Sequence, residues 1–231
     1  MARIASFHLV RESRSKIPFV LARLGLDRAR LDRVDGLAFW RLLGTGRGND
    51  TGPGADLSRS AVFAVWNEES DLDDFLGTHP IARRWDHAAE SWHVRLRSLG
   101  GHGRWRGVDP LDGIEKGERG GPVAIITRAD VRRSAGRAFG HAAREVDAEL
   151  HTAAGLIDVV GIGEAPIGRL ATFSLWESMD AAKAFAYAMP RHQQVIDQTR
   201  AGSWYSEEMF ARFEPYGSIG RWDGRDPLAR R

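Results

Sequence analysis

Cysteine is absent from this chain of 231 residues, which excludes disulfides, thiolate-ligated haem, iron-sulfur clusters and zinc ribbons within it. Any metal site must therefore use His, Asp, Glu or Tyr. No apolar run approaches the roughly 18 residues that a transmembrane segment needs. The first residues, MARIASFHLVRESRSK, also lack the apolar core of a signal peptide. These absences lead us to expect a cytoplasmic protein.

A large charge of one sign is also lacking. Lys and Arg total 33, Asp and Glu total 31, and the formal net charge is only +2. The basic residues are scattered among acidic ones, so we expect no nucleic-acid binding. The glycine-rich pieces GTGRG and GIGEAPIG lack the spacing of a dinucleotide-binding loop. The sequence therefore predicts neither a NAD site nor a FAD site.

An internal repeat is the most informative feature that the sequence does contain. At an offset of 110 residues, AVFAVWNEESDLDDF (61–75) matches ATFSLWESMDAAKAF (171–185). At offsets of up to 119 residues, Gly36 falls on Gly155, and GRWRG (103–107) falls on GRWDG (220–224). Such self-similarity predicts one structural unit that occurs twice.

Hydrophobic periodicity predicts the same order of elements in each half. The first half is expected to contain strands near 4–10, 37–43, 61–66 and 93–99, with helices near 17–34 and 71–91. The second half is expected to contain strands near 123–127, 156–162, 170–176 and 208–213, with helices near 130–153 and 178–200. Each half then reads as a βαββαβ unit, which has an antiparallel sheet with both helices on one face.

We therefore expect an α+β fold in which two tandem ferredoxin-like repeats pair their sheets into an α+β barrel, with a cavity between sheet and helices. The expected boundaries are a first repeat at 1–111, a linker at 112–122, a second repeat at 123–222 and a flexible tail at 223–231.

Four finer expectations concern single residues. Alternation places Phe7, with Ala5 and Leu9, toward the helices and His8 on the opposite face. Asp130 is expected to cap the helix that follows it. Gly44 and Gly46, with their counterparts Gly161 and Gly163, are expected in tight turns that end strands. The segment 46–58 is expected to be a mobile loop.

Six segments resemble the spheroidene monooxygenase family in their order and spacing. They are FWRLLGTG (39–46), AESW (89–92), AIITRADVR (124–132), GIGEAPIG (161–168), TFSLWESMDAAKAFAY (172–187) and WYSEEMFARF (204–213). The resemblance implies a dimeric α+β-barrel fold, bound haem b and insertion of oxygen into a long apolar substrate, and we expect a homo-oligomer. It also implies a ferredoxin-type electron donor. Ketolation of a carotenoid belongs to the named members, and a relative can act on another substrate.

Without cysteine, an imidazole is the expected ligand of a haem iron. We select His192, in AMPRHQQVI, because Pro190 can begin a new helical segment and because its repeat counterpart is Ala82. One haem per chain requires a donor in only one half. His79, which precedes Pro80, is the next candidate for the ligand.

Further residues are candidates for the site around the cofactor. His8 is a candidate distal catalytic group. Arg83, Arg84 and Arg191 lie near the predicted helix breaks, where they could pair with haem propionates. Several aromatic residues are expected to wall an apolar pocket: Trp40, Trp66, Trp176, Trp204, Phe173, Phe185 and Phe210. Glu164, Glu207 and Glu208 are candidate proton relays.

Two other functions fit the same sequence. One is a cofactor-free oxygenase or isomerase that uses the same barrel. The other is a non-catalytic carrier of haem or of another apolar ligand. A Soret band separates the first from a haem enzyme, and oxygen consumption separates the second.

Overall fold

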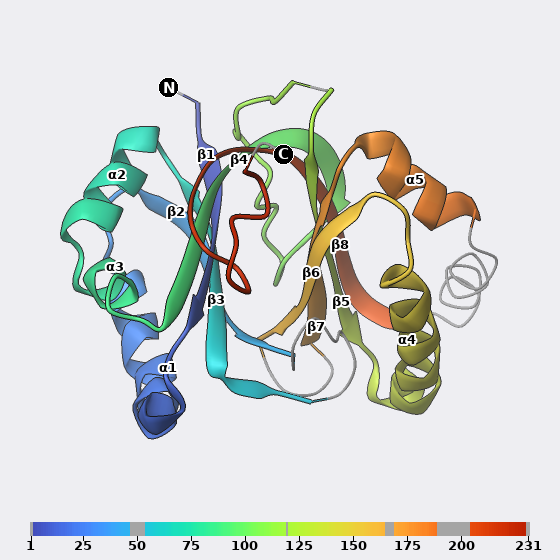
Figure 1. The fold of residues 1–231 in the computed structure, drawn as a ribbon, viewed down its shortest axis with the longest axis horizontal. Helices are drawn as coiled ribbons and strands as arrows, with labels where there is room; N and C mark the ends of the chain where they lie inside the picture. Colours follow the sequence, from blue (N-terminus) through green and yellow to red (C-terminus); the bar gives the residue numbers. More distant parts are fainter. Residues whose placement is uncertain (1, 47–53, 119, 165–168, 189–203, 230–231) are drawn as a thin grey trace.

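The computed structural model describes residues 2–46, 54–118, 120–164, 169–188 and 204–229. Within them, two βαββαβ halves share one closed barrel of antiparallel strands, and the helices cover its outer faces (Figure 1). The strand order is β1-β3-β2-β6-β7-β5-β8-β4. The predicted α+β fold, with two ferredoxin-like repeats whose sheets pair into a barrel, is confirmed.

Elements of the N-terminal half are β1 (Ile4–Arg11), η1 (Arg14–Lys16), α1 (Ile17–Leu31), β2 (Leu37–Thr45), β3 (Asp56–Trp66), α2 (Glu69–Thr78), α3 (Pro80–Trp85) and β4 (Glu90–Gly103). Those of the C-terminal half are β5 (Val123–Val131), η2 (Arg133–Ala135), α4 (Gly136–Leu150), β6 (Leu156–Gly163), β7 (Arg169–Trp176), α5 (Met179–Ala188) and β8 (Tyr205–Gly220).

Two seams of unequal length close the barrel between the halves. β4 pairs with β8 from Trp92↔Gly220 to Gly103↔Met209, whereas β2 pairs with β6 only at Gly44↔Gly163 and Thr45↔Ile162. The prediction that Gly44 and Gly163 lie in tight turns is therefore wrong, because they pair across the shorter seam.

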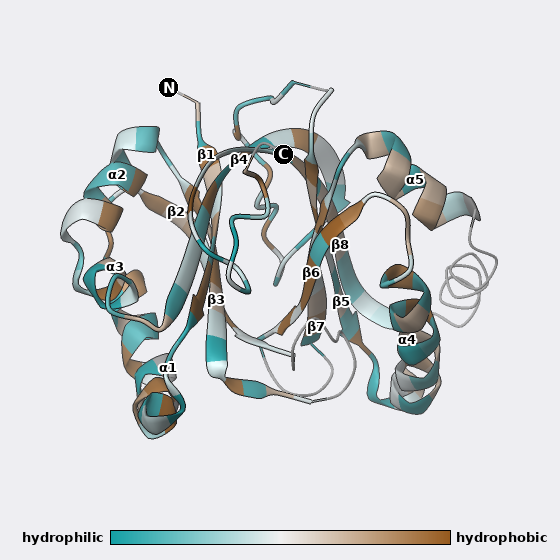
Figure 2. Ribbon diagram, viewed as in Figure 1, coloured by the Kyte–Doolittle hydropathy of each residue, from teal (hydrophilic) through white to brown (hydrophobic). Residues whose placement is uncertain are grey.

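The barrel interior holds the largest apolar cluster, and smaller clusters lie under the helices of each half. Hydrophobic residues accordingly concentrate on the strands, while the outer sides of the helices are mostly hydrophilic (Figure 2). Phe7 stacks on Phe173 inside the barrel with ring centroids 3.9 Å apart, and His8 faces Trp85 of α3. We predicted the opposite orientation. Alternation along β1 identifies two faces, but both faces are buried, so it cannot say which one meets the helices.

One further prediction about a helix is wrong, and the helix break expected at Pro80 is confirmed. Asp130 does not cap a helix, because β5 continues to Val131 and α4 begins only at Gly136 with Ala135 as its N-cap. The helix predicted over 71–91 is divided at Pro80, which cannot donate a backbone hydrogen bond to the preceding turn. His79 instead caps α3, since its Nδ1 accepts from Ile81 N at 3.3 Å.

A tight turn after each half's last long strand inserts a tryptophan into the barrel. We call these turns the Trp arms, residues 104–108 and 221–225. Trp105 and Trp222 are each 1% exposed and belong to the interior cluster. The residue after each Trp, Arg106 or Asp223, has a positive φ of 55° or 50°. The backbone bends sharply at these positions.

Each Trp arm is held by a carboxylate from the other half of the chain. Glu207 accepts from the backbone N–H groups of Arg106 and Gly107 at 2.6 and 2.7 Å. Glu90 accepts from those of Asp223 and Gly224 at 3.0 and 2.7 Å. Trp92 Nε1 also donates to Asp226 at 3.1 Å, so residues just beyond the C-terminal Trp arm are anchored on β4. The two halves thus exchange equivalent elements.

Candidate functional site

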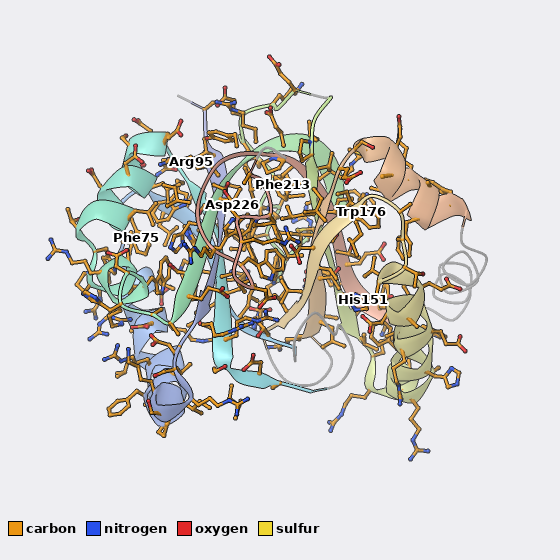
Figure 3. All side chains as sticks on the ribbon, in the orientation of Figure 1. Phe75, Arg95, His151, Trp176, Phe213 and Asp226 are labelled. Carbon is orange, nitrogen blue, oxygen red and sulfur yellow. The ribbon has the colours of Figure 1, made fainter. Side chains whose placement is uncertain are left out.

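A cavity of about 310 Å³ lies in the C-terminal half, between the outer face of its strands and helices α4 and α5. Its walls are mainly apolar and include Phe139, Val146, Leu170, Trp176 and Phe185. Trp176 and Phe185 pack against each other with ring centroids 5.4 Å apart. Figure 3 shows Trp176 beside the sheet in this half. The cavity is in the size range of small-molecule sites, which are concave and mostly apolar.

The equivalent space in the N-terminal half is nearly filled. A void of only about 50 Å³ lies there, and His8 and Trp85 line it. The strand register shows which positions of the two halves are equivalent. His8 pairs with His93 in the N-terminal half, and Thr127 pairs with Phe210 in the C-terminal half. His8 is only 1% exposed, whereas Thr127 is exposed in the middle of its strand. The same scaffold is thus solid on one side and hollow on the other.

Hydroxyl groups line the sheet side of the cavity. Thr127 of β5 and Thr172 of β7 are direct neighbours in the strand register, and both line the cavity. Ser174 is also there, and its Oγ accepts from Trp176 Nε1 at 3.0 Å. A threonine hydroxyl both donates and accepts, so this wall can bind water or a polar ligand atom.

Three cationic side chains also line the cavity, but they differ in their partners. Arg128 is 2% exposed and forms short ion pairs with Asp130 and Glu207, so it is committed to the barrel end. Arg212 is half-buried and, among the described residues, forms no ion pair; its Nε donates to Gly100 O at 3.4 Å. Lys183 Nζ lies 3.6 Å from Oδ1 of the exposed Asp180. Arg212 and Lys183 can therefore bind a carboxylate.

The solid side contains a buried chain of hydrogen bonds. Trp66 Nε1 donates to Ser6 Oγ at 2.8 Å, Ser6 Oγ is 2.8 Å from His8 Nε2, and His8 Nδ1 is 3.0 Å from His93 Nδ1. Because indole is a donor only, the serine hydroxyl can donate onward to His8 and His8 to His93. Burial lowers the pKa of His8 well below its ordinary value and that of His93 to about 4. Both imidazoles are therefore neutral at pH 7.

Among the predicted residues that the structure describes, Phe185, Trp176 and Phe210 lie at the cavity, whereas the predicted histidines and arginines do not. Arg83 and Arg84 are on α3 in the other half, where Arg84 pairs with Asp27 at 2.5 Å. His8 is in the solid half, and His79 caps α3 and stacks on Phe75. His192 and Arg191 lie outside the described residues.

The predicted aromatic residues and carboxylates do not all lie at the cavity. Trp176 and Phe210 line the cavity, whereas Phe173 is inside the barrel. Glu164 is at a barrel end, where Trp105 Nε1 donates to it at 3.2 Å, and Glu207 holds the first Trp arm. These two carboxylates hold the fold together and do not line the cavity.

Sequence reasoning missed Thr127, Thr172 and Arg212. A signal for Thr127 was present, because it stands between Ile125 and Ala129 on one face of a strand, where the first repeat has His8. Arg212 carried no local signal, since arginine is abundant throughout the chain.

Within the described ranges, no group of three or more His, Cys, Asp or Glu side chains is placed to hold a metal ion. In the same part of the chain, no helix is both long and apolar enough to cross a membrane.

Comparison with solved structures shows the fold. An aldoxime dehydratase in complex with butyraldoxime is similar with a TM-score of 0.61 and 13% identity, over 93% of this chain and 79% of that one. A second aldoxime dehydratase structure matches with the same TM-score, 8% identity, and coverage of 95% and 83%.

Comparison with curated sequences shows the family, although no family model matches the chain. The spheroidene monooxygenase of Rhodobacter capsulatus is 32% identical over 230 residues, which cover 98% of this chain and 95% of that protein. The spheroidene monooxygenase of Rubrivivax gelatinosus is 35% identical over 198 residues, covering 82% and 73%. Because this similarity extends through both halves and nearly the full length of the Rhodobacter protein, the chain belongs to the spheroidene monooxygenase family.

Proposed function

We propose that this protein is a haem-dependent monooxygenase that inserts oxygen into a long apolar substrate of the carotenoid type. Family membership supports an oxygenase function. The main support for the proposal is the difference between the halves. The cavity of the C-terminal half has a volume of about 310 Å³, whereas the void in the N-terminal half has a volume of about 50 Å³. Small-molecule sites are concave and mostly apolar, so a pocket with this volume and lining favours a bound ligand.

The cavity residues fit a haem in two respects. Phe139, Val146 and Trp176 offer apolar walls for a porphyrin, while Arg212 and Lys183 offer cations for its propionates. No histidine is among the described lining residues. His192 is our proposed ligand, and it follows the end of α5 by four residues in the sequence. Phe185 and Tyr187 of α5 line the cavity.

Bound haem would supply the activation of oxygen, and the chain would supply the environment. Apolar walls exclude water and hold the substrate by contact. Thr127 and Thr172 can hold a water and relay a proton to the site through their hydroxyls. Each turnover combines O₂, two electrons and two protons with one substrate C–H bond and gives an alcohol and water. A ferredoxin-type donor would supply the electrons, and two such turnovers on one carbon, followed by loss of water, give a ketone.

Absorption spectroscopy of the full chain tests the cofactor. Purified protein titrated with haem should develop a Soret band that shifts on reduction with carbon monoxide, and His192→Ala should weaken or change it. His141→Ala is the matched control, because that imidazole is on α4 with its side chain 77% exposed. A protein that takes up no haem, or an unchanged spectrum in His192→Ala, contradicts the proposal.

Oxygen uptake tests the activity separately. Haem-loaded protein supplied with reduced ferredoxin should consume oxygen when an apolar polyene is added, and the product should gain oxygen by mass spectrometry. Haem binding without oxygen consumption across a panel of polyenes would instead identify a carrier.

A further inference from the structure

Helices α1 and α4, with the short η1 and η2 before them, both extend to the lower end of the molecule in Figure 1, with α1 on one side of the barrel and α4 on the other. From 13 to 26 the chain contains no acidic residue, and its basic residues Arg14, Lys16 and Arg23 are all exposed. From 132 to 144 acidic residues are again absent, and the exposed basic residues are Arg132, Arg133, Arg137 and Arg144. These two stretches together carry seven exposed basic residues and no acidic residue, although the whole chain has a net charge of only +2.

Large apolar side chains are exposed at the same end. Phe19 is 65% exposed and Leu26 is 59% exposed, and both are on α1. They are seven residues apart and so share one helix face, whereas Asp27 and Leu31 on another face are buried. Leu57 is 47% exposed. It lies near the residues that precede η1 and α1, because Glu12 N donates to the carbonyl oxygen of the adjacent Ser58 at 2.7 Å.

Helix α4 links this end to the cavity. Phe139, Ala143 and Val146 of α4 line the cavity, while Arg137 and Arg144 of the same helix are exposed. A surface that contacted these arginines would therefore lie one helix away from the proposed substrate site.

We propose that this end, which we call the basic face (Arg14, Lys16, Phe19, Arg23, Leu26, Arg132, Arg133 and Arg137), docks on an anionic lipid bilayer. Basic residues around exposed Phe and Leu on a helix are the pattern of interfacial binding, in which apolar side chains enter the bilayer and cations contact the headgroups. The proposal rests on the proposed function in one respect, because a long apolar substrate dissolves in a bilayer and docking would bring the cavity to it.

Charge argues for a lipid surface over a second copy of the chain. In a symmetric dimer the same patch meets itself. The basic residues of two copies would then face each other, and like charges repel. An anionic bilayer complements the face instead.

Vesicle flotation tests the proposal with the full chain and no haem or substrate, so the result is independent of the proposed chemistry. The probes are vesicles of phosphatidylcholine alone and vesicles with three parts in ten of phosphatidylglycerol. Binding is expected only to the anionic vesicles and should fall steeply toward 1 M NaCl, where the screening length drops to about 3 Å. Equal binding to both vesicles, or none to either, overturns the proposal.

Matched variants locate the contact. A basic residue near an anionic surface contributes about 1 kcal/mol, which is about fivefold in partitioning. Arg133→Glu should therefore weaken binding by fivefold or more, whereas Lys116→Glu, the same charge change on the exposed 112–122 segment at the opposite end (Figure 1), should not. Phe19→Ala with Leu26→Ala should weaken binding about tenfold or more. Ile219→Ala, at a 62% exposed position of β8, is the control for apolar loss.

All variants are at exposed positions, and their folding is checked by circular dichroism. Equal losses in Arg133→Glu and Lys116→Glu would show net charge acting without a docking face and overturn the proposal. So would a concentration-dependent dimer in ultracentrifugation that Phe19→Ala with Leu26→Ala abolishes, because a second copy would then be the occupant.

Discussion

Acidification should destabilise the protein through the buried His8 and His93 pair. Desolvation by burial lowers the pKa of His93 from an ordinary 6.5 to about 4, with Asp86 opposing the shift. The pKa of His8 is lowered in the same direction by burial and by the nearby His93 and Arg95. The unfolded chain therefore binds protons below pH 6.5 while the folded chain does not. Stability is fully present above pH 6.5 and is lost as the pH falls toward 4.

The size of the loss follows from the shift. One pKa unit corresponds to about 1.4 kcal/mol, so the pH range from 6.5 to 5 costs about 2 kcal/mol for His93 alone. A contribution of the same sign from His8 adds to it. Folded domains are stabilised by only about 5–15 kcal/mol, so this loss is easily measured.

Urea unfolding followed by tryptophan fluorescence at pH 8, 7, 6 and 5 measures the effect. His93→Phe places in β4 the residue that β8 has at Phe210, and it should remove about 2 kcal/mol of the loss between pH 6.5 and 5. His141→Phe, at an exposed position, should keep the wild-type pH dependence. An unchanged pH dependence in His93→Phe, or a loss that occurs mainly above pH 6.5, would refute the reasoning.

Three more predictions follow from the fold and the cavity. Trp222→Ala removes a fully buried side chain and should lower the free energy of unfolding by about 3–5 kcal/mol. Ile219→Ala, at an exposed position, should change that free energy little. Equal shifts of the urea midpoint in the two variants would contradict the burial argument. Arg212→Gln should weaken haem binding about tenfold in a spectroscopic titration, because it removes a charge-assisted hydrogen bond. Arg104→Gln, at an exposed position outside the cavity, should leave the affinity for haem unchanged. Equal affinities of the two variants would exclude Arg212 as a propionate partner. Thr127→Phe should fill part of the cavity and lower haem uptake. It should also raise the unfolding free energy of the ligand-free protein by about 1 kcal/mol or more. A decrease in that free energy would mean that the cavity cannot accept a phenyl ring.

The repeat made most of the fold predictable. Matching segments such as 61–75 and 171–185 fixed two copies of one βαββαβ unit, and all eight strands lie where period-two alternation indicated them. Orientation could not be read in the same way. Both faces of β1 are buried, so its pattern does not distinguish the barrel interior at Phe7 from the helix side at His8.

The candidate site was less predictable because it depends on a difference between two similar halves. Residues near Pro80 in the sequence suggested Arg83 and Arg84, yet these arginines belong to the solid half. The cavity arises where small or polar residues replace bulky ones, as Thr127 replaces His8. Arg212 reaches it from β8, whose place beside β5 only the three-dimensional pairing reveals.

The reciprocal Trp arms have a consequence for how the molecule comes apart. Trp105 is anchored by Glu164 and Glu207, and the turn after Trp222 by Glu90, so neither half can complete its own interior alone. Melting should consequently be a single cooperative event, without a surviving folded half. Proteolytic nicking within 112–122 should leave two interlocked fragments that elute as one species and separate only in denaturant.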